Sequence, residues 1–234
     1  MEDIHITSNK EIIILIGNYG SGKTELAINF ALQGASQGKK TALADIDIVN
    51  PYFRSNNQRA LLESQGIRVI ASPYAGTGID LPIVSAEVDA LFTGDYECAV
   101  IDVGGDPVGA AALGRYCHKL KNIQYKAFLV VNVRRPMCST VEQICGMLKG
   151  IESRSRLTVT GLINNTNLAN ETTAKDLVEG QAIVESAAAD LGLPVAYISG
   201  RAEILNEFER ISPEANGKRF PIVPYMRPSW LDFA

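Results

Sequence analysis

The chain lacks the features that mark membrane-spanning and secreted proteins. No run of 18 apolar residues occurs in its 234 residues, so no transmembrane helix is expected. The first residues, Met1-Glu2-Asp3-Ile4-His5, are acidic and do not have the basic-then-apolar order of a secretory signal. We therefore expect a cytoplasmic protein without a membrane span.

Basic residues are in deficit. Lys and Arg number 22 against 26 Asp and Glu, which gives a formal net charge of −4 and a pI of about 5.3. A dedicated nucleic-acid-binding domain usually carries an excess of basic residues gathered on one face. The composition therefore argues against nucleic acid as the partner.

Cysteine is scarce and is not arranged for metal binding. The four cysteines are Cys98, Cys117, Cys138 and Cys145, and no two of them form a C-x-x-C pair. Cys98 begins an apolar run that is typical of a buried strand. We expect reduced thiols that lie mostly in the core, with a cluster or metal shared by two copies of the chain as the alternative.

Short runs rich in Val and Ile alternate with longer helix-like stretches. The predicted strands are residues 12–16, 41–44, 68–71, 99–102, 127–132, 158–163 and 195–198. The predicted helices are residues 24–37, 53–65, 84–93, 108–120, 139–152, 171–191 and 201–210. This alternation predicts an α/β fold with a doubly wound, mostly parallel sheet and helices on both faces. We expect residues 1–234 to form one domain, with residues 218–234 as a Pro-rich C-terminal arm.

A complete phosphate-binding motif follows the first predicted strand. It reads Gly17-Asn18-Tyr19-Gly20-Ser21-Gly22-Lys23-Thr24, which matches G-x-x-x-x-G-K-[ST]. The glycines let backbone N–H groups turn inward around an anion, and the start of the next helix adds the positive end of its dipole. Lys23 can reach the β- and γ-phosphates, and the Thr24 hydroxyl can ligate Mg²⁺. The motif predicts a P-loop NTPase architecture that binds a nucleoside triphosphate with Mg²⁺ through residues 17–24.

A second anchor for Mg²⁺ is expected at Asp102. The apolar run 98–101 ends in this aspartate, and Val103, Gly104 and Gly105 follow it. A buried strand that ends in Asp and continues as D-x-x-G is typical of a Walker B strand. We expect Asp102 to hold Mg²⁺ through water and the Gly105 N–H to contact the γ-phosphate.

A third acidic element follows the predicted strand 41–44. It reads Asp45-Ile46-Asp47-Ile48-Val49-Asn50-Pro51. The Asp47 carboxylate could accept a hydrogen bond from the attacking water or bind Mg²⁺ through water. The alternative is a capped turn before the next helix, for which Asp, Asn and Pro are typical residues.

These motifs together resemble the MinD/ParA-like P-loop ATPases, a group that includes the nitrogenase iron protein and the cobyrinic-acid-type ligases. The resemblance spans about residues 10–200 and rests on residues 17–24, the Asp45–Pro51 element and Asp102-x-x-Gly105. A fourth element, residues 161–167, resembles the segment that contacts adenine in the iron-protein branch. The resemblance thus implies ATP as the nucleotide and Asn164 as an adenine contact.

The chain departs from this family at the second position of the loop. Many members dimerise face to face around two ATP molecules, and a signature lysine at this position reaches the partner's nucleotide. Here the position holds Asn18, and Tyr19 replaces the glycine that usually follows. Arg134 and Arg135, just after the predicted strand 127–132, are candidates for the missing cation. The alternative for them is a solvated pair of arginines in a loop.

The resemblance implies a slow ATPase that acts as a switch. Its ATP or ADP state would control binding to a protein partner, which the sequence does not name, or to a second copy in an ATP-dependent homodimer. The alternative is a small-molecule kinase or ATP-dependent ligase, whose acceptor pocket residues 72–82 could line. A GTPase would need Asn-Lys-x-Asp after a strand, and the nearest stretches, at 132–135 and 164–167, have neither the lysine nor the aspartate.

Overall fold

A computed structural model of the chain describes residues 10–46, 58–71, 87–93, 96–104, 107–121 and 123–226. Several sequence predictions lie outside these residues: the catalytic and Mg²⁺-binding roles of Asp47, the γ-phosphate contact of Gly105, the acceptor-lining segment 72–82 and residues 227–234 of the C-terminal arm. Within the described residues, no helix is both long enough and apolar enough to cross a membrane.

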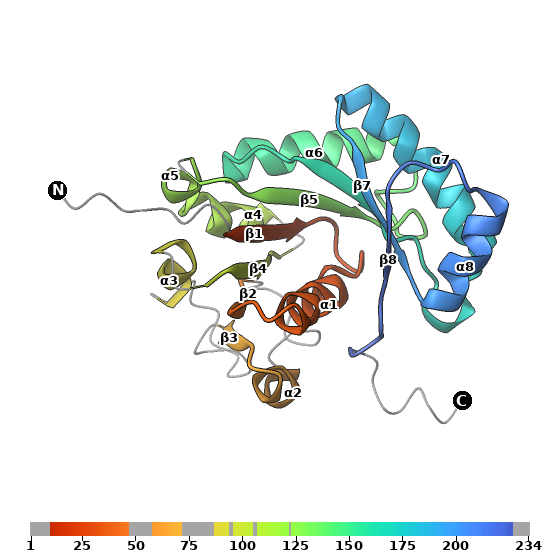
Figure 1. The fold of residues 1–234 in the computed structure, drawn as a ribbon. Coiled ribbons are helices and arrows are strands. Elements are labelled where there is room, and N and C mark those ends of the chain that lie inside the picture. The colour runs from red at the N-terminus through yellow and green to blue at the C-terminus, as the bar shows by residue number, and fades with distance from the viewer. Residues whose placement is uncertain are drawn as a thin grey trace.

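The centre of the molecule is one eight-stranded sheet in which every pairing of described strands is parallel (Figure 1). The strand order is β3-β2-β4-β1-β5-β6-β7-β8. The strands are β1 (Glu11–Ile16), β2 (Thr41–Asp45), β3 (Arg68–Ala71), β4 (Cys98–Asp102), β5 (Lys126–Val131), β6 (Gly161–Asn164), β7 (Val195–Gly200) and β8 (Lys218–Pro221). The predicted fold class is confirmed.

Helices cover both faces of the sheet. They are α1 (Lys23–Ser36), α2 (Arg59–Ser64), α3 (Glu87–Thr93), α4 (Pro107–Gly114), α5 (Cys117–Leu120), α6 (Val141–Ser155), α7 (Ala174–Leu191) and α8 (Ala202–Ile211). One core joins Ile13 and Leu15 of β1 to α1, α2 and Phe220 of β8. The other joins Ile12 and Ile14 to helices α3 to α8. The alternate residues of β1 therefore serve two separate cores, which explains why the central strands are apolar almost without interruption.

Three elements differ from the sequence prediction, and one of them is the predicted strand 158–163, which begins only at Gly161. The predicted helix 108–120 is broken into α4 and α5, because the chain turns after Gly114 and the Tyr116 N–H returns to the Leu113 carbonyl at 3.0 Å. Strand β8 was predicted only as part of the arm. Pro221 has no backbone N–H to donate to a neighbouring strand. A proline is tolerated here because β8 is the edge strand of the sheet.

The chain that follows β8 crosses to the start of α1, beside the edge of the sheet in Figure 1. The Asn29 side chain exchanges two hydrogen bonds with the Val223 backbone, each 2.9 Å long. The Glu25 carboxylate accepts from Tyr225 N at 2.6 Å and from Met226 N at 3.1 Å. Burial raises the pKa of the Glu25 carboxyl, and the two backbone donors oppose that shift. Residues 223–226 are thus tied to the first two turns of α1.

Candidate nucleotide-binding site

The polar motifs meet at the carboxyl edge of the sheet. The loop 17–22 follows β1, Asp45 ends β2 and Asp102 ends β4. The strand register places Asp102 opposite Asp45 on one side and opposite Leu15 on the other. Ligands of open parallel sheets bind at this edge, so the fold brings the predicted phosphate and metal residues to one place.

The backbone of the phosphate loop is possible only with glycine at its key positions. Gly22 has φ +88° and forms the N-cap of α1, and a Cβ there would lie 2.3 Å from Asn165 Nδ2. A Cβ on Gly17 would lie 2.4 Å from the Val130 carbonyl oxygen. The loop therefore packs directly against the ends of β5 and β6. The loop and the start of α1 thus lie together at the place where the sequence predicts an anion site.

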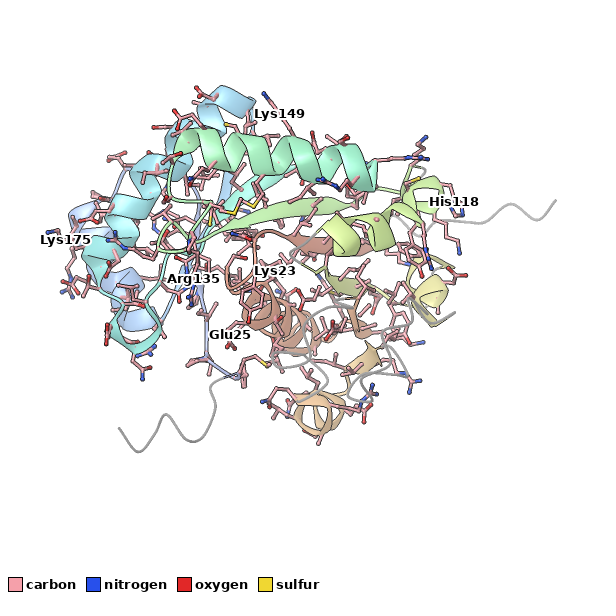
Figure 2. All side chains as sticks on the ribbon, turned by 180° about the vertical axis from the view of Figure 1, so that it is seen from behind. Lys23, Glu25, His118, Arg135, Lys149 and Lys175 are labelled. Carbon is pink, nitrogen blue, oxygen red and sulfur yellow. The ribbon has the colours of Figure 1, made fainter. Side chains whose placement is uncertain are left out.

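Lys23 lies over its own loop. The side chain is 6% exposed, and Nζ donates to the Asn18 carbonyl at 3.0 Å. Figure 2 shows Lys23 near the middle of the molecule, at the start of α1. A buried ammonium held against the phosphate loop is suited to bind phosphate oxygens.

The residues at the ends of β2 and β4 fit a magnesium ion. Thr24 Oγ1 donates to Asp102 Oδ2 at 2.7 Å, and Asp102 is 1% exposed. Asp45 is also buried, on the neighbouring strand. Hydroxyl and carboxylate oxygens are the ligands that Mg²⁺ prefers, and a cation would offset the cost of burying two carboxylates together.

A nucleotide would complete that ligand set. Within the described residues, no group of three or more His, Cys, Asp or Glu side chains could hold a metal. Mg²⁺ in phosphate-transfer sites takes one or two carboxylates and completes its shell with phosphate oxygens and water. The Ser21 hydroxyl is buried and makes no hydrogen bond to any described residue, so a phosphate oxygen would also satisfy it.

The asparagine that contacts the phosphate loop is Asn165, whereas the amide of Asn164, the predicted adenine contact, is bonded inside the fold. Asn164 is fully buried, and its Nδ2 donates to the Leu177 carbonyl at 3.2 Å and to Gln181 Oε1 at 3.0 Å. A contact between Asn164 and adenine would require this packing to rearrange. Asn165 Nδ2 instead donates to the Ser21 carbonyl at 2.7 Å. Side chains of successive residues in an extended chain point to opposite sides. This alternation is the sequence signal by which only one of Asn164 and Asn165 could be expected to face the loop.

The side chain at the signature position is turned into the fold. Asn18 Nδ2 donates to the Pro136 carbonyl at 2.8 Å, and Asn18 Oδ1 accepts from Tyr19 N at 2.8 Å. Residue 18 therefore ties the phosphate loop to the β5–α6 connection. Tyr19 is 61% exposed and Met137, on the other side of this contact, is 72% exposed.

The two candidate arginines have different surroundings. Arg134 Nε and Nη2 donate to Asp176 Oδ1 at 3.0 and 2.7 Å, and Nη2 also donates to Glu179. The Thr173 hydroxyl, and then Arg134, lower the pKa of the Asp176 carboxyl. Arg135 Nε donates to the Gly20 carbonyl of the phosphate loop at 3.2 Å. Arg134 is thus paired with carboxylates of α7, whereas Arg135 contacts the phosphate loop.

Solved structures with the same architecture are known. The cell division protein FtsY from Thermotoga maritima is 19% identical with a TM-score of 0.56, over 84% of this chain and 65% of that chain. Chloroplast FtsY from Physcomitrella patens is 16% identical with a TM-score of 0.57, over 84% and 60%. The signal recognition particle 54 kDa protein from Aeropyrum pernix K1, in complex with GDP, is 19% identical with a TM-score of 0.57, over 83% and 42%.

The chain has the P-loop NTPase fold. At these identities the similarity shows the fold alone, and the chain spans less than two thirds of the length of the three proteins. No protein-family model matches the chain, and no curated protein matches it in sequence. The resemblance to MinD/ParA-like proteins is therefore supported as a P-loop NTPase fold, and its finer assignment stays a prediction.

Proposed function

We propose that the protein binds ATP with Mg²⁺, hydrolyses it slowly, and acts as a nucleotide-dependent switch on a protein partner. The observation that carries this proposal is the phosphate loop 17–24, whose Thr24 hydroxyl is hydrogen-bonded to the buried Asp102. A P-loop lysine, a Mg²⁺-ligating hydroxyl and a Walker B carboxylate are the parts that a nucleoside triphosphatase of this fold needs.

In the proposed reaction, water attacks the γ-phosphorus while its bond to the bridging oxygen of ADP breaks. The products are ADP and dihydrogen phosphate, which retains both protons of the water. Lys23 and the N–H groups of the loop would bind the β- and γ-phosphates, and Thr24 and Asp102 would hold Mg²⁺. When bound, Mg²⁺ neutralises charge on the phosphates. The sequence prediction for Asp47 adds a carboxylate that orients the water.

Basal hydrolysis by the isolated protein is expected to be slow, well below the enzyme median of about 10 per second. The reason is that the Asn18 side chain, at the signature position, carries no charge and is bonded to Pro136. Single-turnover hydrolysis, followed together with gel filtration, measures the rate and any ATP-dependent dimer. Asp47→Ala is expected to leave a stable ATP-bound form. Fast turnover by an isolated monomer would contradict the switch and favour the kinase or ligase alternative.

ATP is expected to be preferred over GTP. Guanine presents two adjacent N–H donors that GTPases read with a carboxylate, whereas adenine presents one donor and one acceptor, which suit an amide. Residues 165–170, which follow β6, contain three asparagines and no acidic residue. Competition of ATP and GTP for a labelled nucleotide measures the preference. Equal displacement of the labelled nucleotide by ATP and GTP would refute the preference for ATP. Tighter binding of GTP would make the nucleotide preference of this chain similar to that of the GDP-bound structure of similar fold.

A further inference from the structure

The Arg135 side chain lies against the phosphate loop. Its Nε is 3.2 Å from the Gly20 carbonyl oxygen. A Cβ built on Gly20 would lie 3.2 Å from Arg135 Nε and 3.5 Å from Cζ, so the guanidinium packs on the bare Cα of that glycine. Lys23 Nζ contacts the same loop at Asn18. In Figure 2 the two side chains are labelled at the same end of α1. Two cations therefore flank residues 18–20.

The position of Arg135 is set by the backbone that carries it. The Arg135 N–H donates to the Asn132 carbonyl at 3.0 Å, which closes a turn directly after β5. The next residue, Pro136, accepts the hydrogen bond from Asn18. The Cys138 thiol donates to the Asn132 carbonyl at 3.1 Å and closes the same turn from the other side. The turn is thus attached both to the sheet and to the phosphate loop.

The neighbouring arginine shows what a purely structural role looks like here. Arg134 is paired with two carboxylates of α7, Asp176 and Glu179. Within the described part of the chain, Arg135 forms no ion pair, and its side chain donates one hydrogen bond, to the carbonyl of Gly20. A guanidinium bonded to a loop carbonyl can exchange that partner for a phosphate oxygen at little cost, because both are acceptors.

We propose that Arg135 is a further catalytic residue, which donates hydrogen bonds to γ-phosphate oxygens from within the same chain during ATP hydrolysis. The inference rests on the proposed function. As the bond from water oxygen to phosphorus forms, the bond to the bridging oxygen breaks and its electron pair stays on ADP. Arg135 transfers no proton, because a guanidinium does not deprotonate in proteins. Its charge stabilises the phosphoryl group in the transition state.

The expected effect is moderate. A hydrogen bond to a charged group contributes about 1.5–3 kcal/mol, which corresponds to a rate change of about 10- to 150-fold. An arginine enclosed by a partner protein can contribute about 10³–10⁵. Arg135 is exposed to solvent, which screens its charge, so the lower range applies.

The test compares Arg135→Ala with Arg134→Ala, two adjacent substitutions with the same change of charge. Arg135→Ala is expected to lower the single-turnover rate about 10- to 150-fold and to weaken binding of ADP–aluminium fluoride, a transition-state mimic, by a similar factor. Its ATP affinity should stay within about threefold of wild type, because the contact forms in the transition state. Arg134→Ala should keep the wild-type rate. Arg135→Lys, which keeps the charge, should retain part of the rate.

Mixing variants tests whether Arg135 acts within its own chain. Lys23→Ala keeps Arg135 but is expected to bind ATP only weakly, so at ATP concentrations below its Kd a mixture of Lys23→Ala with Arg135→Ala should stay as slow as Arg135→Ala alone. Recovery of the rate would overturn the same-chain assignment.

A wild-type rate for Arg135→Ala, or an equal loss of ATP affinity and rate, would overturn the catalytic role. If Arg135→Ala does not melt cooperatively, Arg135→Lys takes its place. The hydrolysis rate of Arg135→Lys and its affinity for ADP–aluminium fluoride then decide whether Arg135 is catalytic. Hydrolysis that survives Lys23→Ala would instead refute the proposed function.

Discussion

Replacing Lys23 with alanine is expected to weaken ATP binding about 30- to 5,000-fold, which corresponds to the loss of about 2–5 kcal/mol when one partner of a buried charge pair is removed. The Lys23 side chain is almost fully buried and its ammonium lies on the phosphate loop, so no other residue of α1 can take its place. The fold should remain intact, since the Lys23 ammonium lies against the phosphate loop and not in either apolar core.

Calorimetry with ATP and Mg²⁺ measures this loss directly. The matched control is Lys149→Ala, because Lys149 is exposed on α6, well away from Lys23 in Figure 2. Thermal melting of both variants checks that the fold is retained. An ATP affinity of Lys23→Ala equal to that of the control would refute the phosphate-loop assignment and, with it, the proposed function.

Asp102→Asn is expected to retain nucleotide binding and to lower turnover at least about a hundredfold, since Mg²⁺ supplies several kcal/mol of charge stabilisation in such reactions. An asparagine can keep a hydrogen bond to Thr24, which is now 2.7 Å from Asp102 Oδ2. It loses the negative charge that attracts the ion. The Mg²⁺ concentration needed for half-maximal hydrolysis should therefore rise.

Hydrolysis measured over a series of Mg²⁺ concentrations provides the test. Asp190→Asn, an exposed position on α7, makes the same chemical change away from the site and should behave as wild type. Melting curves identify any loss of stability caused by changing the buried Asp102. If the variant hydrolyses ATP at the wild-type rate and with the wild-type Mg²⁺ dependence, Asp102 is not the Walker B residue.

The parts of the site that are local in sequence could be predicted. The phosphate loop is eight consecutive residues whose spacing reflects the shape of a phosphate, and Asp102 follows directly on an apolar strand. The parallel sheet could be predicted for a similar reason, because strands buried on both faces are apolar almost throughout. In each case the signal lies within a few residues of the feature that it predicts.

The contacts that join distant segments could not be predicted. Arg135 meets Gly20 across 115 residues, and Asn165 meets Ser21 across 144. No periodicity or local motif encodes such pairs, which depend on how strands β1, β5 and β6 are ordered in the sheet. The choice between Arg134 and Arg135, and between Asn164 and Asn165, needed the direction of each side chain.

The hydrogen bonds between α1 and residues 223–226 also bear on the order in which the protein forms during synthesis. Glu25 and Asn29 are translated early, but their backbone partners follow 194 to 201 residues later. At about 5–20 residues per second, a ribosome needs roughly 10–40 seconds to make that interval. Until then, strand β8 is absent from the edge of the sheet and the Glu25 carboxylate lacks both of its donors. Helix α1 is therefore among the first elements synthesised and among the last to acquire all of its hydrogen bonds.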